Sequence, residues 1–150
     1  GDNTAVLADE MVLAGQSGVG VLHSGTQETI TVSIEDMMPQ MLSVATMLVN
    51  TNDAFSGINA MVIKDLALNE SISMQTSSYD AGTEMNSELM TTIPGPAGGG
   101  EGFNEMRDDV DFVAMHSGIV SQDDGLMQSA LTQAHRFDNP TLMITITRIQ

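Results

Sequence analysis

Short runs in which polar and apolar residues alternate constrain the fold of this chain more than any other feature. In residues 141–149, Leu142, Ile144 and Ile146 alternate with Met143, Thr145 and Thr147. This is the period of a β-strand that turns one face to a core and the other to water. Five further segments read as strands, and they span residues 29–34, 41–49, 58–63, 71–75 and 110–115. The pattern indicates an all-β fold, an antiparallel sandwich or barrel.

Only one segment favours a helix. Residues 4–14 are rich in helix formers, Asn3 or Thr4 is available as an N-cap, and Gly15 follows as a stop signal. We therefore expect one short N-terminal helix.

A long loop is expected between residues 76 and 105. It contains Pro94-Gly95-Pro96 and the run Gly98-Gly99-Gly100, which exclude regular structure from its middle. Loops longer than about 12 to 15 residues in compact domains are usually functional or disordered. This segment is therefore where we look for function.

Length and charge limit the classes of function. A chain of 150 residues suits a single domain, 1–150. Its net charge of −16 repels phosphate backbones and anionic lipids, which argues against nucleic-acid and membrane-surface partners. The sequence has no run of about 18 apolar residues, which a helix that crosses a membrane would need. Cysteine is absent, so disulfides and thiolate metal sites are excluded.

Known catalytic motifs fit poorly. Gly15-Gln16-Ser17-Gly18-Val19 resembles a nucleophile elbow, but Val19 replaces the last glycine. His23, His116 and His135 are too scattered for a helical zinc pair, although a Ser-His-Asp triad assembled by the fold stays open. We predict that the chain is not an enzyme, with a hydrolase as the less favoured alternative.

Methionine is abundant, with 13 residues. Met37, Met38 and Met41 lie close enough in sequence to suggest copper(I) ligation by thioethers. A chain with so few aromatic residues also needs flexible apolar filler, and we favour that interpretation.

Acidic and amide residues gather in two predicted loops. Asn50, Asn52 and Asp53 follow one strand, and Asp80 and Glu84 follow another. Gly82 between the last two allows a tight turn that aims both carboxylates at one point. Calcium needs about six to eight hard oxygen ligands, which such loops supply, although acidic loop residues are more often simply solvated.

The same stretches carry a family resemblance. Met41 to Val49 leads into Asn52-Asp53-Ala54-Phe55-Ser56-Gly57, and Tyr79-Asp80-Ala81-Gly82-Thr83-Glu84 precedes the Pro-Gly loop and Asn139-Pro140. Together they resemble the spondin N-terminal (F-spondin) domain family in its bacterial, cysteine-free form. The resemblance implies a C2-like antiparallel β-sandwich that binds Ca²⁺ through Asp53, Asp80 and Glu84. It also implies a role in extracellular matrix and cell adhesion.

Two departures from the family pattern have consequences. Glu84 stands where animal relatives carry Asp, which lengthens the reach of one ligand. The family also has further sequence before the equivalent of Gly1, so the domain is expected to lack its N-terminal strand or strands. A second chain that donates such a strand would produce self-assembly.

The sequence thus predicts a secreted, extracellular calcium-binding module without catalytic activity, whose partner is an extracellular protein or glycan. The alternative is a structural subunit of a surface fibre or matrix, assembled by strand addition.

Overall fold

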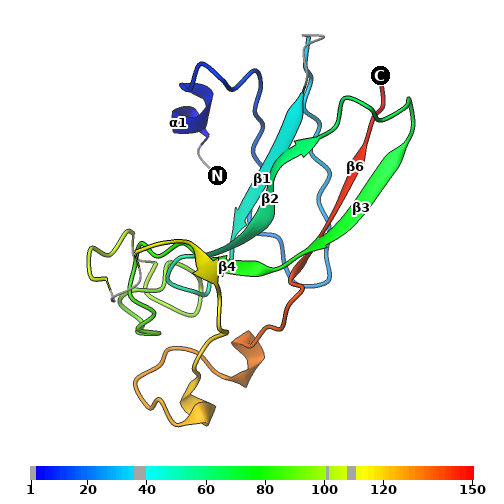
Figure 1. Cartoon of the computed structure of the whole chain (residues 1–150). Coiled ribbons are helices and arrows are strands. Elements are labelled where there is room, and N and C mark those ends of the chain that lie inside the picture. The colour runs from blue at the N-terminus through cyan, green and yellow to red at the C-terminus, as the bar shows by residue number, and fades with distance from the viewer. Residues whose placement is uncertain (1–2, 36–39, 101, 108–110) are drawn as a thin grey trace. The chain divides into compact units, whose positions relative to one another are not determined.

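The computed structural model describes residues 3–35, 40–100, 102–107 and 111–150 (Figure 1). Its contacts divide the chain into two compact units, Gly1–Gln40 and Met41–Gln150. The single domain stays a prediction.

The first unit contains one short helix, α1 (Thr4–Leu7). The predicted helix to Ala14 is therefore too long. Asn3 makes no capping hydrogen bond through its side chain, and the Asp9 carboxylate accepts the Met11 N–H at 2.9 Å. Such a turn competes with the helical hydrogen bonds, and a helix this short has little cooperativity of its own.

The predicted strand at residues 29–34 is wrong, because residues 27–35 form no strand. Alternation makes a segment suitable for a sheet, but the strand forms only when a neighbour pairs with its backbone. No described residue pairs with this segment in a ladder.

The second unit is built from antiparallel strands (Figure 1). One sheet has the order β1-β2-β4-β5 and the other pairs β3 with β6. Their bounds are β1 (Met41–Met47), β2 (Ala54–Val62), β3 (Ser71–Thr76), β4 (Ser78–Asp80), β5 (Ala114–Met115) and β6 (Leu142–Thr147). Two 3-10 helices, η1 (Gln122–Asp124) and η2 (Gln133–His135), lie before β6. The predicted all-β class with antiparallel sheets is confirmed.

Four predicted strands are found, with shifted ends. They correspond to β1, β2, β3 and β6. The strand predicted at 110–115 is reduced to Ala114–Met115, and Val110 lies outside the described residues. β4 was not predicted, because a strand of three residues shows no periodicity. It forms by pairing with β2 on one side and β5 on the other.

The β3–β6 sheet has the two faces that alternation predicts. Ile72 pairs with Ile146 and Met74 with Ile144, and these side chains are half-buried. On the opposite face, exposed hydroxyls bond across the strands at 2.8 Å, joining Ser71 to Thr147 and Ser73 to Thr145. β2 contacts both β3 and β6, so the two sheets meet along it.

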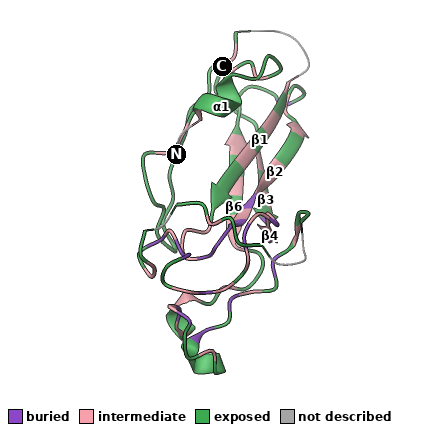
Figure 2. Ribbon diagram, turned by 90° about the vertical axis from the view of Figure 1, so that its left-hand side faces the viewer, coloured by how far each residue is buried: buried purple, intermediate pink, exposed green. Residues whose placement is uncertain are grey.

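The best-buried core lies among the loops. Ile93, Ile119 and Leu131 form it, with Phe137 and two alanines packed around them. Figure 2 shows the buried segments gathered near β4 and in the loops rather than along β1. The described residues between β4 and β5 contain turns and no strand apart from Leu89, which forms an isolated bridge with Ser129 beyond β5. The predicted long loop is therefore confirmed. It is a packed part of the fold.

Candidate metal site

The turn between β1 and β2 places the first group of candidate residues. Thr51 donates its backbone N–H and its hydroxyl to the Leu48 carbonyl, at 3.0 and 2.6 Å. The same hydroxyl accepts the Ala54 N–H at 3.1 Å. This closed turn holds Asn50, Asn52 and Asp53 in defined positions.

Asn50 and Asn52 anchor the long loop. Asn50 Oδ1 accepts the Ala97 N–H at 3.0 Å. Asn52, which is buried, donates to the Thr92 carbonyl at 3.1 Å and accepts the Glu88 N–H at 3.4 Å. Both amides thus satisfy backbone groups of the loop, a structural role that residue type alone did not reveal.

Asp53 clamps the segment that contains Glu84. Its Oδ2 accepts the Thr83 N–H and the Thr83 hydroxyl, both at 2.7 Å, and the Glu84 N–H at 3.0 Å. The side chain is 9% exposed, and Oδ1 is buried with no hydrogen-bond partner. One oxygen is therefore fully used and the other is left over.

Asp80 closes the turn that the sequence predicted around Gly82. Asp80 Oδ1 accepts the Gly82 N–H at 2.7 Å, and Oδ2 accepts a hydrogen bond from Asn86 Nδ2. Gly82 has a φ of 68°, and a Cβ there would lie 2.6 Å from the Phe112 carbonyl oxygen. The turn is confirmed, but it occupies both oxygens of the half-buried Asp80 with internal bonds.

Glu84 repeats the pattern of Asp53. It is 6% exposed, and its Oε1 accepts the Asn104 N–H at 3.0 Å. Its Oε2 is buried and has no partner. The Asp53 carboxylate is thus bonded to the backbone of Glu84, and each of the two residues keeps one buried carboxylate oxygen without a partner.

Among the residues that the structure describes, no basic side chain compensates these acids. In the part of the chain that the structure describes, the ion pair is Arg136 Nη1–Asp124 Oδ1, at 2.9 Å, and none of the three predicted ligands contacts Lys or Arg. Buried carboxylates are normally paired with a cation, because desolvation of the charge is costly. The arrangement therefore lacks a positive charge.

His116 adds a third unpartnered buried atom. Its backbone N–H bonds to the Ser78 carbonyl at 3.0 Å, and its ring lies 5.4 Å from that of Phe137. Nδ1 accepts the Gly118 N–H at 3.0 Å, whereas Nε2 is buried and has no partner. Burial lowers the pKa of His116, and the charges of Asp80 and Asp53 oppose that shift. Nothing in the sequence pattern distinguishes this histidine from the other two.

The predicted trio does not form a ready-made ligand cluster. Among the described residues, no group of three or more His, Cys, Asp or Glu side chains is arranged to hold a metal ion. Asp53 and Glu84 are brought together, and Asp80 lies in the adjoining turn. Calcium also accepts backbone carbonyl, amide and water oxygens, so a calcium site could form here with fewer than the three carboxylates that the family pattern implies. The site stays a prediction.

Glu88 is a further buried acid that the sequence did not single out. It is 3% exposed, its Oε1 accepts the Val120 N–H at 3.2 Å, and its backbone adopts a φ of 58°. Burial raises the pKa of Glu88, and the hydrogen bond from Val120 opposes this shift. Glu88 joins three loop segments through its main chain and side chain.

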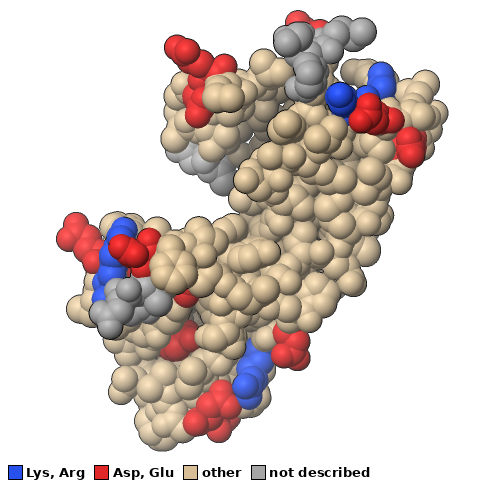
Figure 3. Space-filling view, viewed as in Figure 1, with Lys and Arg blue, Asp and Glu red and all other residues tan. Residues whose placement is uncertain are grey.

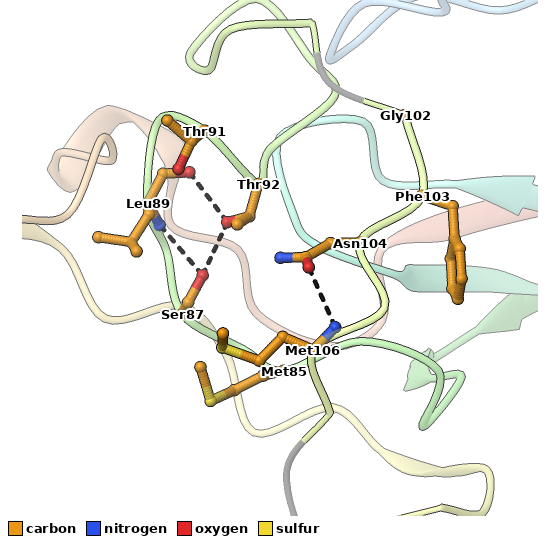
Figure 4. Close-up of a pocket in the computed structure, with 9 residues that line it drawn as sticks. All are labelled: Met85, Ser87, Leu89, Thr91, Thr92, Gly102, Phe103, Asn104 and Met106. Atoms are coloured by element: carbon orange, nitrogen blue, oxygen red, sulfur yellow. Dashed lines mark hydrogen bonds between the residues drawn. The ribbon is translucent and has the colours of Figure 1, made fainter.

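A cavity of about 370 Å³ adjoins the Glu84 segment (Figure 4). Asn104, which bonds to Glu84, lines it, and Asn104 Oδ1 accepts the Met106 N–H at 3.0 Å. A network across one wall joins the Ser87 and Thr92 hydroxyls at 2.7 Å. The remaining lining is largely apolar and comes from Met85, Leu89, Thr91, Gly102, Phe103 and Met106.

The other candidate sites gain little from the structure. His135 Nδ1 lies 3.2 Å from the Thr132 hydroxyl, but it also accepts the Thr132 N–H, so this contact caps η2. Met41 is 62% exposed, and Met37 and Met38 lie outside the described residues. The hydrolase and copper alternatives stay untested.

Comparison with family models, curated proteins and solved structures produced no match. The resemblance to the spondin N-terminal family stays a prediction. No helix in the described part of the chain has the length and apolar character needed to cross a membrane.

Proposed function

We propose that the chain is a secreted, non-catalytic calcium-binding module of the extracellular adhesion or matrix type, with a C2-like β-sandwich of the spondin N-terminal kind. The observation that carries the proposal is the pair formed by Asp53 and Glu84. Each is buried, each keeps one oxygen without a partner, and the Asp53 carboxylate bonds to the Glu84 backbone.

The physical argument concerns uncompensated charge. An unpaired buried carboxylate costs several kcal/mol in desolvation, by order of magnitude. A divalent cation that contacts both would offset this cost, and calcium prefers carboxylate and carbonyl oxygens. Asp53 Oδ1 and Glu84 Oε2 are the atoms that would hold it, with Asp80 contributing from the adjoining turn.

The position of the site suggests what calcium does. Asp53 follows β1, Glu84 follows β4, and Asn104 ties Glu84 to the far side of the long loop. A cation there stabilises the loops against one another. The module would then present these loops to an extracellular protein or glycan partner, since its net charge of −16 disfavours nucleic acid.

The test is calcium binding by isothermal titration calorimetry together with thermal unfolding in calcium and in excess chelator. A ligand present at about 100 times its Kd stabilises the folded state by about 2.7 kcal/mol. We expect Glu84→Gln and Asp80→Asn to lose most of the calcium-dependent gain. Asp123→Asn, at an exposed acid that accepts one backbone hydrogen bond, is the matched control. An unchanged melting temperature in excess chelator contradicts the calcium site.

A second candidate function, a fibre or matrix subunit assembled by strand addition, is favoured by the strands themselves. β1, β2, β3 and β6 contain no Asp, Glu, Lys or Arg. On the face shown in Figure 3, the surface over the strands is largely uncharged. β1 is an edge strand of its sheet, and natural edges usually carry charges or proline that prevent pairing. Sedimentation velocity tests this function, and a monomer at every concentration would count against it.

A further inference from the structure

Many of the described methionines lie on the surface rather than in the core. The best-buried core consists of Ile93, Ile119 and Leu131, with Phe137 and two alanines around them. The exposed methionines are Met11, Met41, Met47, Met90, Met106, Met115, Met127 and Met143. Their thioethers are open to oxidants in solution, and methionine is oxidised reversibly to its sulfoxide.

Met115 differs from the others in the contact of its sulfur. Asn139 Nδ2 donates to Met115 Sδ at 3.7 Å. The amide cannot be turned round without loss of a second bond, because Asn139 Oδ1 accepts the Ser78 N–H at 2.7 Å. In the part of the chain that the structure describes, no other methionine sulfur accepts a hydrogen bond. Met115, which is 60% exposed, therefore combines an open thioether with a donor held beside it.

This donor suits the oxidised side chain better than the reduced one. A thioether sulfur is only a weak acceptor. Oxidation gives the sulfur a polar oxygen, to which an N–H held nearby can donate. A donor placed where negative charge develops on an oxygen also lowers the barrier to the reaction.

We propose that Met115 is an oxidant-responsive modification site, at which peroxide forms a sulfoxide whose oxygen accepts a hydrogen bond from the Asn139 amide. The sulfur attacks one oxygen of hydrogen peroxide, and the S–O bond forms as the O–O bond breaks. The sulfur loses two electrons, and the second oxygen takes the proton of the transferred hydroxyl and leaves as water. Neither residue is a predicted calcium ligand, so the inference is independent of the proposed function.

The position of Met115 gives the modification a consequence for one face of the sheet. Met115 pairs with Tyr79, and Tyr79 pairs with Phe55, with the two ring centroids 5.8 Å apart. Phe55 in turn pairs with Met47. Because residues paired across antiparallel strands share a face, these four side chains form a row across β1, β2, β4 and β5. Oxidation places a polar group at one end of this largely apolar row.

The experiment follows oxidation of the full chain by hydrogen peroxide, once in the folded state and once unfolded in urea. Peptide mapping by mass spectrometry gives the rate at each methionine. Met143 is the matched control, because it is also an exposed strand residue, at 68%, but no hydrogen bond reaches its sulfur. The variant is Asn139→Asp, which keeps an oxygen for the Ser78 N–H but has no N–H to donate to Met115.

We expect Met115 of the folded wild-type protein to be oxidised about fivefold faster than Met143, which is the value of one hydrogen bond. In urea the two rates should be alike, and in folded Asn139→Asp the advantage of Met115 should disappear.

Two results would overturn the proposal. Met115 could be oxidised no faster than Met143 in the folded wild-type protein, or it could keep its advantage in Asn139→Asp. If Asn139→Asp does not fold, the comparison of Met115 with Met143 in folded and unfolded wild-type protein still decides the question.

Discussion

Replacement of Asp53 by alanine tests whether this side chain holds the loops together without any metal. In the structure, Asp53 Oδ2 accepts the Thr83 N–H, the Thr83 hydroxyl and the Glu84 N–H at 2.7, 2.7 and 3.0 Å. A hydrogen bond to a charged group contributes about 1.5 to 3 kcal/mol, and each buried donor left unpaired adds a cost of similar size. Loss of an uncompensated buried charge offsets part of this.

We therefore expect Asp53→Ala to lower the free energy of unfolding by about 3 to 5 kcal/mol in excess chelator, a large share of the roughly 5 to 15 kcal/mol that holds a typical domain folded. Asp53→Asn keeps one carbonyl acceptor and should lose about 1 to 2 kcal/mol. The assay is equilibrium urea unfolding followed by circular dichroism.

Asp123→Ala supplies the control for the Asp53 series. Asp123 also accepts a backbone N–H, from Gln133 at 2.9 Å, but the bond is exposed. Its loss should cost less than about 1 kcal/mol. If Asp53→Ala falls within that same range, the three hydrogen bonds do not stabilise the loops as argued, and the clamp is refuted.

Two further substitutions test buried features of the same loops. Burial raises the pKa of Glu88, so the stability associated with its protonated form is complete at low pH and lost as pH rises through the folded-state pKa, above the ordinary value of 4.5. Glu88→Gln should therefore be more stable than wild type at about pH 7 and lose that advantage on acidification, and a destabilised variant at neutral pH would contradict this. Gly82→Ala should cost more than Gly100→Ala in urea unfolding. Both glycines have positive φ, 68° and 74°, but only the Gly82 Cβ would meet a backbone oxygen, that of Phe112. Equal costs would show that the turn tolerates a side chain.

Alternation predicted most strands because it is a local property. β1, β2, β3 and β6 lie where polar and apolar residues alternate, and Gly82 marks a turn because its φ of 68° suits glycine. Residues 29–34 alternate equally well and form no strand, since pairing requires a neighbour that the pattern cannot supply. β4 shows the converse, because its neighbours define it.

The candidate site likewise has features that the sequence predicted and features that only the fold determines. The sequence located Asp53 and Glu84 in the loops that carry them, whereas Asp80 proved to be the last residue of β4. Residue type did not show which oxygens stay free. Internal bonds occupy both oxygens of Asp80, whereas Asp53 and Glu84 each keep one. That distinction depends on contacts between residues about thirty positions apart, which only folding creates.

By itself, the sequence determined the β class, the long Pro-Gly loop, the acidic surface and the places where carboxylates follow strands, because periodicity, backbone freedom and charge are local or additive properties. Only the tertiary structure decided that the best-buried core lies among the loops, that Asn50 and Asn52 serve as anchors, and that His116 is buried with its Nε2 unpartnered. These features depend on which distant segments meet, because burial between such segments determines which polar atoms find partners and which do not.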